Sequence, residues 1–279
     1  RKKAKLRMGL VAPSGAGKTY SALLIAFGLG GKVGVIDTEN GSADLYANLG
    51  DYDVITLSAP FTIAKYIESI KAFENAGYNT IIIDSLSHAW AGDGGLLDKQ
   101  GKIVDMGKGN SYTAWRQITP EHNSLIESML QSKCHIIATM RAKTEYVMEV
   151  TEKGKQAPKK VGLAPVQRDG MDYEFTVVLD IDVATHQATS SKDRTGLFDG
   201  QIFKPTRETG ERLLEWLNDG ADAPDYDAIL NGVEASPDTE MLKANYLAAK
   251  ELLPERLLAS LDSVKVKRYY ELNPQQPKG

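Results

Sequence analysis

The chain has 279 residues, of which 42% are hydrophobic and 25% charged, and its formal net charge is −4. This composition predicts one substantial hydrophobic core with a smaller appendage. It excludes a protein that coats nucleic acid with its whole surface, although a local basic loop remains compatible with it. No apolar run approaches the roughly 20 residues of a membrane-spanning helix, so we expect no membrane partner. A single cysteine, Cys134, excludes an internal disulfide or a multi-cysteine zinc site and favours a reducing, cytoplasmic setting.

Short apolar runs alternate with amphipathic stretches over residues 1–218. This alternation predicts an α/β domain with a mainly parallel, twisted sheet flanked by helices. The expected strands are 8–12, 33–37, 54–57, 80–84, 135–140 and 175–182. The expected helices are 19–28, 62–76, 119–132 and 210–218, the third with Thr119 as its N-cap and Pro120 in its first turn.

Two segments interrupt this alternation, and a third follows it. Residues 92–109 are rich in Gly and Lys without periodicity, which predicts a mobile loop. Residues 143–172 predict a protruding β-hairpin, with strands 145–150 and 159–163 joined through Lys153-Gly154-Lys155. Residues 219–279 predict a linker followed by a small helical C-terminal extension, with helices near 238–253 and 255–272.

The segment Ala12-Pro13-Ser14-Gly15-Ala16-Gly17-Lys18-Thr19 matches the phosphate-binding pattern GxxxxGK[ST] except at its first position. It follows an expected strand and opens an expected helix, which is the context that this P-loop requires. Backbone N–H groups of the loop would hold the phosphates, aided by the helix dipole. Lys18 would reach the β- and γ-phosphates, Thr19 would bind Mg²⁺, and Tyr20 would adjoin the nucleotide. We expect ATP to be the nucleotide.

Two carboxylates follow the expected strands at the positions that such a site needs. Asp84 ends the apolar strand 80–84, as in the Walker B pattern, and would bind Mg²⁺ through water. Glu39 follows the strand 33–37, where it could polarise the attacking water as a general base. An exposed Glu in a turn is the alternative reading of Glu39.

These segments together resemble the RecA-type recombinase ATPases. The resemblance rests on the P-loop, Ile36-Asp37-Thr38-Glu39, Tyr46 and Ile83-Asp84-Ser85, in that order. It implies that Glu39 is catalytic and that Tyr46 stacks on adenine, although Tyr46 could simply pack. Residues 135–141 resemble the strand that carries the γ-phosphate sensor. The usual Gln or Asn is absent there, and Thr139 or Arg141 could take the role.

The segment Ser190-Ser191-Lys192-Asp193-Arg194-Thr195-Gly196 resembles the KxRxG segment of the DnaB-like and RecA-like hexameric ATPases. In those proteins the Lys and Arg reach the γ-phosphate of the neighbouring subunit. The resemblance therefore implies that Lys192 and Arg194 act in trans and that the chain forms a homo-oligomer, either a ring or a filament. A charged hairpin turn is the alternative.

The core, over about residues 5–217, more narrowly resembles the bacteriophage and prophage RecA-like AAA-type ATPases. The matching segments are 115–116, 119–123, 143–146, 159–165 and 191–195. Some members of that family are single-strand annealing proteins that work with a phage single-stranded-DNA-binding protein. The resemblance implies a role on single-stranded DNA in the cytoplasm of a bacterial host.

The residues themselves give weaker support for DNA binding. Segments 92–113 and 143–172 are the candidate loops, and the second carries six basic against five acidic residues. Its basic residues Lys153, Lys155, Lys159 and Lys160, together with Arg168, could contact the backbone of a strand. Tyr112, Trp115 or Tyr146 could stack on bases. A solvated charged loop is the alternative.

The leading hypothesis is thus an ATP-hydrolysing, RecA-like protein acting on single-stranded DNA in phage recombination or strand annealing. We expect DNA to stimulate its ATPase activity. Two alternatives remain open. One is an ATP-dependent hexameric translocase or helicase component. The other is an annealing scaffold that ATP stabilises with little turnover. No NKxD sequence is present, so nothing supports specificity for GTP.

Overall fold

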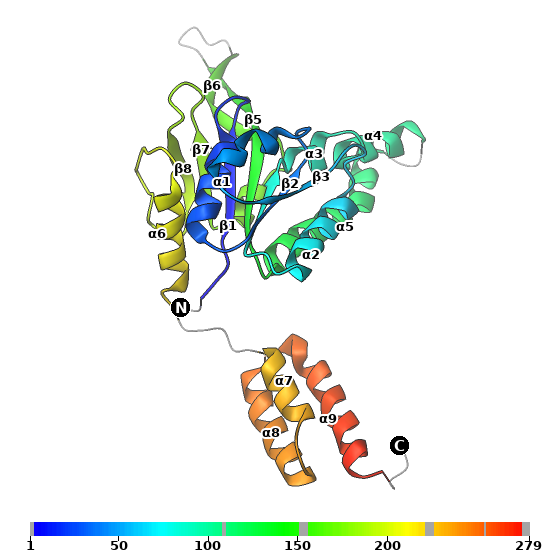
Figure 1. Ribbon diagram of the computed structural model, residues 1–279. Coiled ribbons are helices and arrows are strands. Elements are labelled where there is room, and N and C mark those ends of the chain that lie inside the picture. Colours follow the sequence, from blue (N-terminus) through cyan, green and yellow to red (C-terminus); the bar gives the residue numbers. More distant parts are fainter. Residues whose placement is uncertain (1–2, 108–109, 151–155, 221–225, 254, 275–279) are drawn as a thin grey trace. The chain divides into compact units, whose positions relative to one another are not determined.

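The computed structural model describes residues 3–107, 110–150, 156–220, 226–253 and 255–274. For residues 144–150, 156–163 and 256 it describes the backbone alone. The chain divides into two compact units, Ala4–Asp219 and a smaller one beginning at Gly220 (Figure 1). Among the described residues, no helix has both the length and the apolar character needed to cross a membrane.

The larger unit is built on one mostly parallel sheet, as the alternation of elements predicts. Its described strands are β1 (Arg7–Ala12), β2 (Val33–Asp37), β3 (Asp53–Thr56), β4 (Thr80–Asp84), β5 (His135–Val150), β6 (Gln156–Pro165), β7 (Val177–Ile181) and β8 (Ala188–Asp193). The spatial order is β3-β2-β4-β5-β1-β7-β8, with parallel pairing from β3 to β7. β8 is antiparallel to β7, and β6 pairs with the outer part of β5 as a hairpin. The predicted α/β class with a RecA-like P-loop core is confirmed.

Helices cover both faces of this sheet (Figure 1). The helical elements are α1 (Lys18–Leu29), η1 (Ser42–Leu49), α2 (Ile63–Asn75), α3 (Ser87–Ala91), α4 (Leu96–Asp105), α5 (Ser111–Gln131), η2 (Met171–Glu174) and α6 (Arg207–Asn218). Apolar side chains of α1 and α6 belong to one core cluster, and those of α2 and α5 belong to another. The sheet therefore lies between two helical layers.

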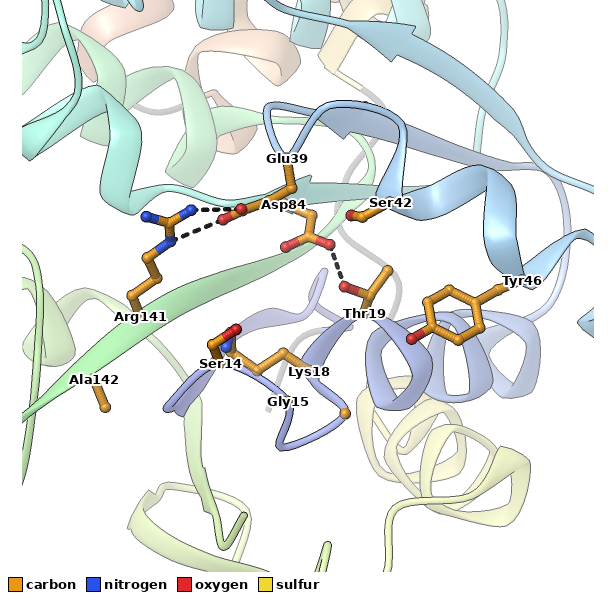
Figure 2. A pocket seen from close by; sticks show the side chains of 11 residues that line it. Ser14, Gly15, Lys18, Thr19, Glu39, Ser42, Tyr46, Asp84, Arg141 and Ala142 are labelled. Atoms are coloured by element: carbon orange, nitrogen blue, oxygen red, sulfur yellow. Dashed lines mark hydrogen bonds and ion pairs between the residues drawn. The ribbon is translucent and has the colours of Figure 1, made fainter.

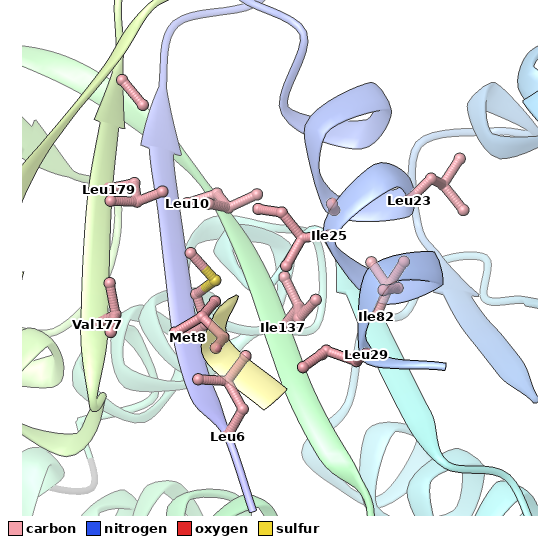
Figure 3. Packing of buried hydrophobic residues seen from close by; sticks show 14 of the residues in the cluster. Leu6, Met8, Leu10, Leu23, Ile25, Leu29, Ile82, Ile137, Val177 and Leu179 are labelled. Atoms are coloured by element: carbon pink, nitrogen blue, oxygen red, sulfur yellow. The ribbon is translucent and has the colours of Figure 1, made fainter. Parts of the chain in front are cut away.

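The central strands supply both clusters because successive side chains of a strand point to opposite faces. Ile82 of β4 and Ile137 of β5 pack toward α1 (Figure 3). Their neighbours Ile81 and Ile83 pack toward α2 and α5. All five residues of β4 are buried, which explains why its centre, residues 81–83, is an unbroken apolar run.

Helices α1 and α6 approach one another backbone to backbone at two glycines. A Cβ atom placed on Gly28 would lie 2.0 Å from the carbonyl oxygen of Arg207. One placed on Gly210 would lie 2.1 Å from the carbonyl oxygen of Ile25. Backbone atoms cannot rotate away as a side chain can, so larger residues at these positions would force the helices apart. This contact fixes the helix that begins at the P-loop.

We expect Gly28→Ala to lower the free energy of unfolding by about 3 kcal/mol, because overpacking outweighs the better helix propensity of Ala. Gly101 in α4 provides the matched control, since a Cβ atom there would meet nothing within 4 Å. Gly101→Ala should stabilise the protein by about 0.5–1 kcal/mol. Urea denaturation of the three proteins measures both effects. Equal effects of the two substitutions would contradict the close approach of α1 and α6.

Two predicted helical features were wrong. Residues 92–109 were expected to be a loop, yet α4 occupies Leu96–Asp105, where Leu96 is buried and Lys102 pairs with Asp98 at 2.6 Å. The expected helix 119–132 begins earlier, at Ser111, with Asn110 as its N-cap. Pro120 therefore lies inside α5. The Thr119 hydroxyl donates to the Trp115 carbonyl oxygen at 2.8 Å and so supplies a hydrogen bond beside the break that Pro120 causes.

The smaller unit is a bundle of helices with its own core. It contains α7 (Tyr226–Glu234), α8 (Thr239–Leu252), the short η3 (Glu255–Leu257) and α9 (Leu258–Leu272). Their shared core is formed by Val233, Leu242, Ala249, Leu253 and Leu261. The predicted helices near 238–253 and 255–272 correspond to α8 and α9, whereas α7 was not predicted. Residues 221–225, which include most of the predicted linker, lie outside the described residues.

Candidate active site

The P-loop connects the fully buried strand β1 to the start of α1. Gly15 and Gly17 have φ values of 81° and 85°, in the left-handed region that favours glycine. Gly17 is the N-cap of α1 and has no side chain that could accept from the first N–H groups of the helix. The first N–H groups of a helix have no partner within the helix, so here they are available to an anion.

Lys18 lies over this loop. Its Nζ atom donates to the carbonyl oxygens of Ala12 at 3.0 Å and Pro13 at 2.8 Å. Burial lowers the pKa of Lys18, while Asp84 and Glu39 act in the opposite direction, and the net shift is downward. The ammonium group is thus held by carbonyl oxygens that a phosphate could replace.

Asp84, at the end of β4, joins the P-loop to the neighbouring strand. Its carboxylate accepts a hydrogen bond of 2.5 Å from the Thr19 hydroxyl (Figure 2) and another of 2.5 Å from the Thr139 hydroxyl. The residue is 1% exposed, and this burial raises the pKa of Asp84. Thr139 is itself fully buried against Asp84, whereas Arg141 lines the pocket. The geometry therefore favours Arg141 over Thr139 as the group that could meet a γ-phosphate.

Glu39 and Arg141 form a two-pronged ion pair across the pocket (Figure 2). Arg141 Nε donates to Glu39 Oε1 at 3.0 Å, and Arg141 Nη2 donates to Oε2 at 2.5 Å. Burial opposes ionisation of Glu39, but the hydrogen bonds and charge of Arg141 prevail and lower the pKa of Glu39. Each oxygen of the candidate base therefore accepts one hydrogen bond from Arg141.

Two pockets flank the P-loop. The first, of about 600 Å³, is lined by Ser14, Gly15, Gly17, Lys18, Thr19, Glu39, Ser42, Tyr46, Asp84, Arg141 and Ala142. The second, of about 490 Å³, is lined by Gly15, Ala16, Gly17, Tyr20, Ser21, Leu24, Tyr46, His186, Lys204, Pro205 and Thr206. They share Gly15, Gly17 and Tyr46. The rings of Tyr20 and Tyr46 meet edge to face, with centroids 5.8 Å apart. No sequence motif pointed to Ser42, His186 or the segment 204–206.

Lys192 and Arg194 are not brought to this site within the chain. Lys192 pairs with Val178 of β7, and Val178 pairs with Gly9 of β1. The P-loop follows the far end of β1, about 10 Å further along the strand direction. Both cations instead donate to the Tyr173 carbonyl oxygen, at 2.7 Å from Lys192 and 3.1 Å from Arg194. The pair lies at the β8 edge of the sheet.

The candidate DNA-binding residues are only partly described. Lys153 and Lys155 lie outside the described residues, and the side chains of Lys159 and Lys160 in β6 are not described. Arg168 is described, and its guanidinium carbon lies 5.9 Å from the centre of the Trp115 ring. Trp115 also stacks on Trp90 at 5.3 Å, so it is engaged within the chain.

The model of the AAA domain family matches residues 4–216. The chain belongs to the AAA domain family. It is accordingly a P-loop ATPase, and the match spans almost the whole of the larger unit. Among solved structures, this AAA domain protein is similar to an ATPase from the type III secretion system of pathogenic bacteria. That similarity covers 93% of this chain and 81% of the other, at 13% identity and a TM-score of 0.40. No curated protein matches the sequence.

Asp84→Asn is expected to stabilise this AAA domain protein in the absence of nucleotide and metal. Burial raises the pKa of Asp84 above its ordinary 3.8, so the folded state holds this proton more tightly than the unfolded state. Stability therefore falls as the pH rises from 3.8 through the raised pKa, and it stays lower above that range. The amide cannot ionise, so the variant should melt at a higher temperature at pH 7. Its advantage should shrink toward pH 4 in thermal scans, and a lower melting temperature at every pH would contradict the pKa shift.

Proposed function

We propose that this AAA domain protein binds ATP with Mg²⁺, hydrolyses it, and acts as a homo-oligomer on single-stranded DNA in phage recombination or strand annealing. One observation carries the catalytic half of the proposal. Lys18, Thr19, Asp84 and Glu39 line a single pocket at the P-loop, although they come from three separate segments of the sequence. That set supplies a phosphate clamp, metal ligands and a base.

The pocket fits a magnesium ion. Thr19 and Asp84 present oxygen atoms, which Mg²⁺ prefers, and Mg²⁺ usually takes one or two protein ligands besides phosphates and water. Beside them, Asp37 is fully buried, and its Oδ2 atom has no hydrogen-bond partner among the described residues. No group of three or more His, Cys, Asp or Glu in the described part of the chain could hold a metal alone. When bound, Mg²⁺ would neutralise charge on the β- and γ-phosphates.

The chain's own residues account for the remaining requirements. The N–H groups at the start of α1 and the Lys18 ammonium would hold the phosphates. Glu39 would orient and polarise the attacking water, once its carboxylate is no longer fully bound by Arg141. Arg141 would then be free to bind the γ-phosphate, which carries more negative charge than the Glu39 carboxylate. Tyr46, which lines both pockets, would contact the base.

The DNA half rests on the resemblance to phage annealing proteins and on the position of the hairpin. Arg141 belongs to β5, and the same strand continues without a break into the β5–β6 hairpin. A strand of DNA bound at the hairpin would therefore act on the backbone that carries the partner of Glu39. We expect single-stranded DNA to accelerate ATP turnover.

Steady-state turnover with and without single-stranded DNA tests this proposal, with a Mg²⁺-free arm. The expected result is Mg²⁺-dependent turnover that rises when the DNA is added. Absence of turnover in every arm would contradict the catalytic half. If the ATP turnover rate is the same with and without DNA, and no DNA binds at low salt, only the DNA half is contradicted.

A scaffold that ATP stabilises with little turnover is the second candidate function. The observation that favours it is the ion pair of Glu39 with Arg141, which engages both oxygens of the candidate base and lowers its pKa, so that Glu39 is a weaker base. In that case assembly, rather than hydrolysis, would anneal strands. Annealing that persists when hydrolysis is abolished would favour the scaffold.

A further inference from the structure

The second pocket contains a histidine that is placed to recognise a ligand. His186 lies in the turn between β7 and β8, far from the P-loop in sequence. Its Nδ1 atom lies 3.2 Å from the carbonyl oxygen of Ala16 within the loop. We propose that His186 selects adenine over 6-keto purines by accepting a hydrogen bond from the adenine amino group. This inference rests on the proposed function of the site as an ATP pocket.

The contact with Ala16 decides which ring nitrogen carries the proton. A carbonyl oxygen can only accept, so Nδ1 must be the donor. In a neutral imidazole the other nitrogen, Nε2, then has a lone pair and accepts. Among the described residues, Nε2 has no hydrogen-bond partner. The P-loop backbone thereby makes His186 an acceptor toward the pocket that it lines.

The turn holds His186 in an unusual backbone conformation. Its φ is 56°, a left-handed value that costs energy for a residue with a side chain. Asp182 fixes this geometry, since its carbonyl oxygen accepts from the His186 N–H at 2.9 Å. Its Oδ1 atom also accepts from the N–H groups of Ala184 and Thr185, at 3.0 and 2.8 Å. These bonds hold the backbone at His186, and the contact of Nδ1 with the Ala16 carbonyl oxygen is what positions the ring.

The rest of the pocket suits a flat purine ring. Tyr20, Tyr46, Leu24 and Pro205 supply its aromatic and aliphatic surface, and the P-loop glycines connect it to the phosphate pocket. A nucleotide with its phosphates on the loop could thus place its base among these residues. Adenine carries an amino group at C6, where guanine and hypoxanthine carry a carbonyl oxygen. The Nε2 lone pair would attract the first and repel the second.

Calorimetric binding of ADP, IDP, GDP and 2′-deoxyADP with Mg²⁺ to the full chain tests this proposal. Wild type should bind ADP about tenfold more tightly than IDP or GDP, as expected for one hydrogen bond and its loss. His186→Phe keeps a ring but no acceptor, and it should reduce the preference to within about twofold, chiefly by weakening ADP. His186→Gln, whose amide oxygen can accept, should restore part of it. Gln187→Ala, in the same turn but outside the pocket, is the control and should behave as wild type.

Each contrary outcome overturns a different statement. If wild type binds no nucleotide, the proposed function fails. If it binds ADP and IDP equally, or if His186→Phe keeps the preference, the proposed function stands and the role of His186 is wrong. If His186→Phe abolished a preference for ADP over 2′-deoxyADP but kept the preference for ADP over IDP, His186 would contact the ribose instead. Melting curves of each variant separate these outcomes from misfolding.

Discussion

Glu39→Gln should reduce ATP turnover by about 10²–10⁴-fold while leaving nucleotide binding nearly unchanged, because a general base contributes that much to the rate. The amide keeps the size of the side chain and can still accept a hydrogen bond from Arg141 through its oxygen. It cannot take a proton from water. Turnover under saturating ATP and the affinity for ADP, measured on one preparation, separate catalysis from binding.

Glu68→Gln on the exposed surface of α2 is the matched control, because it removes the same charge outside the pocket. It should turn over ATP as wild type does. If Glu39→Gln kept its activity within about threefold, Glu39 would be no more than a partner of Arg141. Strand annealing by the same variant distinguishes the two candidate functions. Annealing should persist without hydrolysis only if the protein is a scaffold.

The P-loop side of this site was predictable from the sequence because its signals are local. The glycines at 15 and 17, Lys18 and Thr19 lie within one turn and one helix start, so their spacing alone fixes their arrangement. Asp84 was predictable because the carboxyl ends of parallel strands meet at one edge of a sheet. The bounds of β2 and β4 were predicted to the residue, since both strands are buried on both faces.

The rest of the site depends on contacts between distant segments, which leave no periodic trace. His186 meets the P-loop only because β7 pairs with β1, and nothing around position 186 resembles a motif. The pairing of Glu39 with Arg141 spans 102 positions and could not be inferred from either segment. Polar edge strands such as β8 also lack the apolar run by which buried strands are recognised. By contrast, α7 carries apolar residues at 226, 229, 230 and 233. This is a helical spacing, so α7 could have been predicted from the sequence although it was not.

A mixture of two variants that are each inactive should regain ATP turnover if the active site is completed between subunits. Arg194→Ala keeps its own P-loop but lacks a cation for its neighbour, and it should lose about 10³–10⁵ in turnover. Lys18→Ala lacks the phosphate clamp but keeps Lys192 and Arg194. In an equal mixture, about one quarter of head-to-tail interfaces would join an intact P-loop to an intact pair of cations. We therefore expect the mixture to recover up to about one quarter of wild-type turnover per interface.

Geometry within one chain is the reason to expect this recovery. Lys192 and Arg194 bind the Tyr173 carbonyl oxygen at the β8 edge, about 10 Å or more along the strand direction from the end of β1 that leads into their own P-loop. A mixture of Arg194→Ala with Lys192→Ala is the control, and it should stay inactive, because every interface then lacks one cation. If the first mixture also stayed inactive while differently tagged copies of the two variants co-purified as mixed oligomers, Lys192 and Arg194 would belong to a charged turn and not to the active site. Recovery in the first mixture alone would mean that the P-loop of each chain is half of a site.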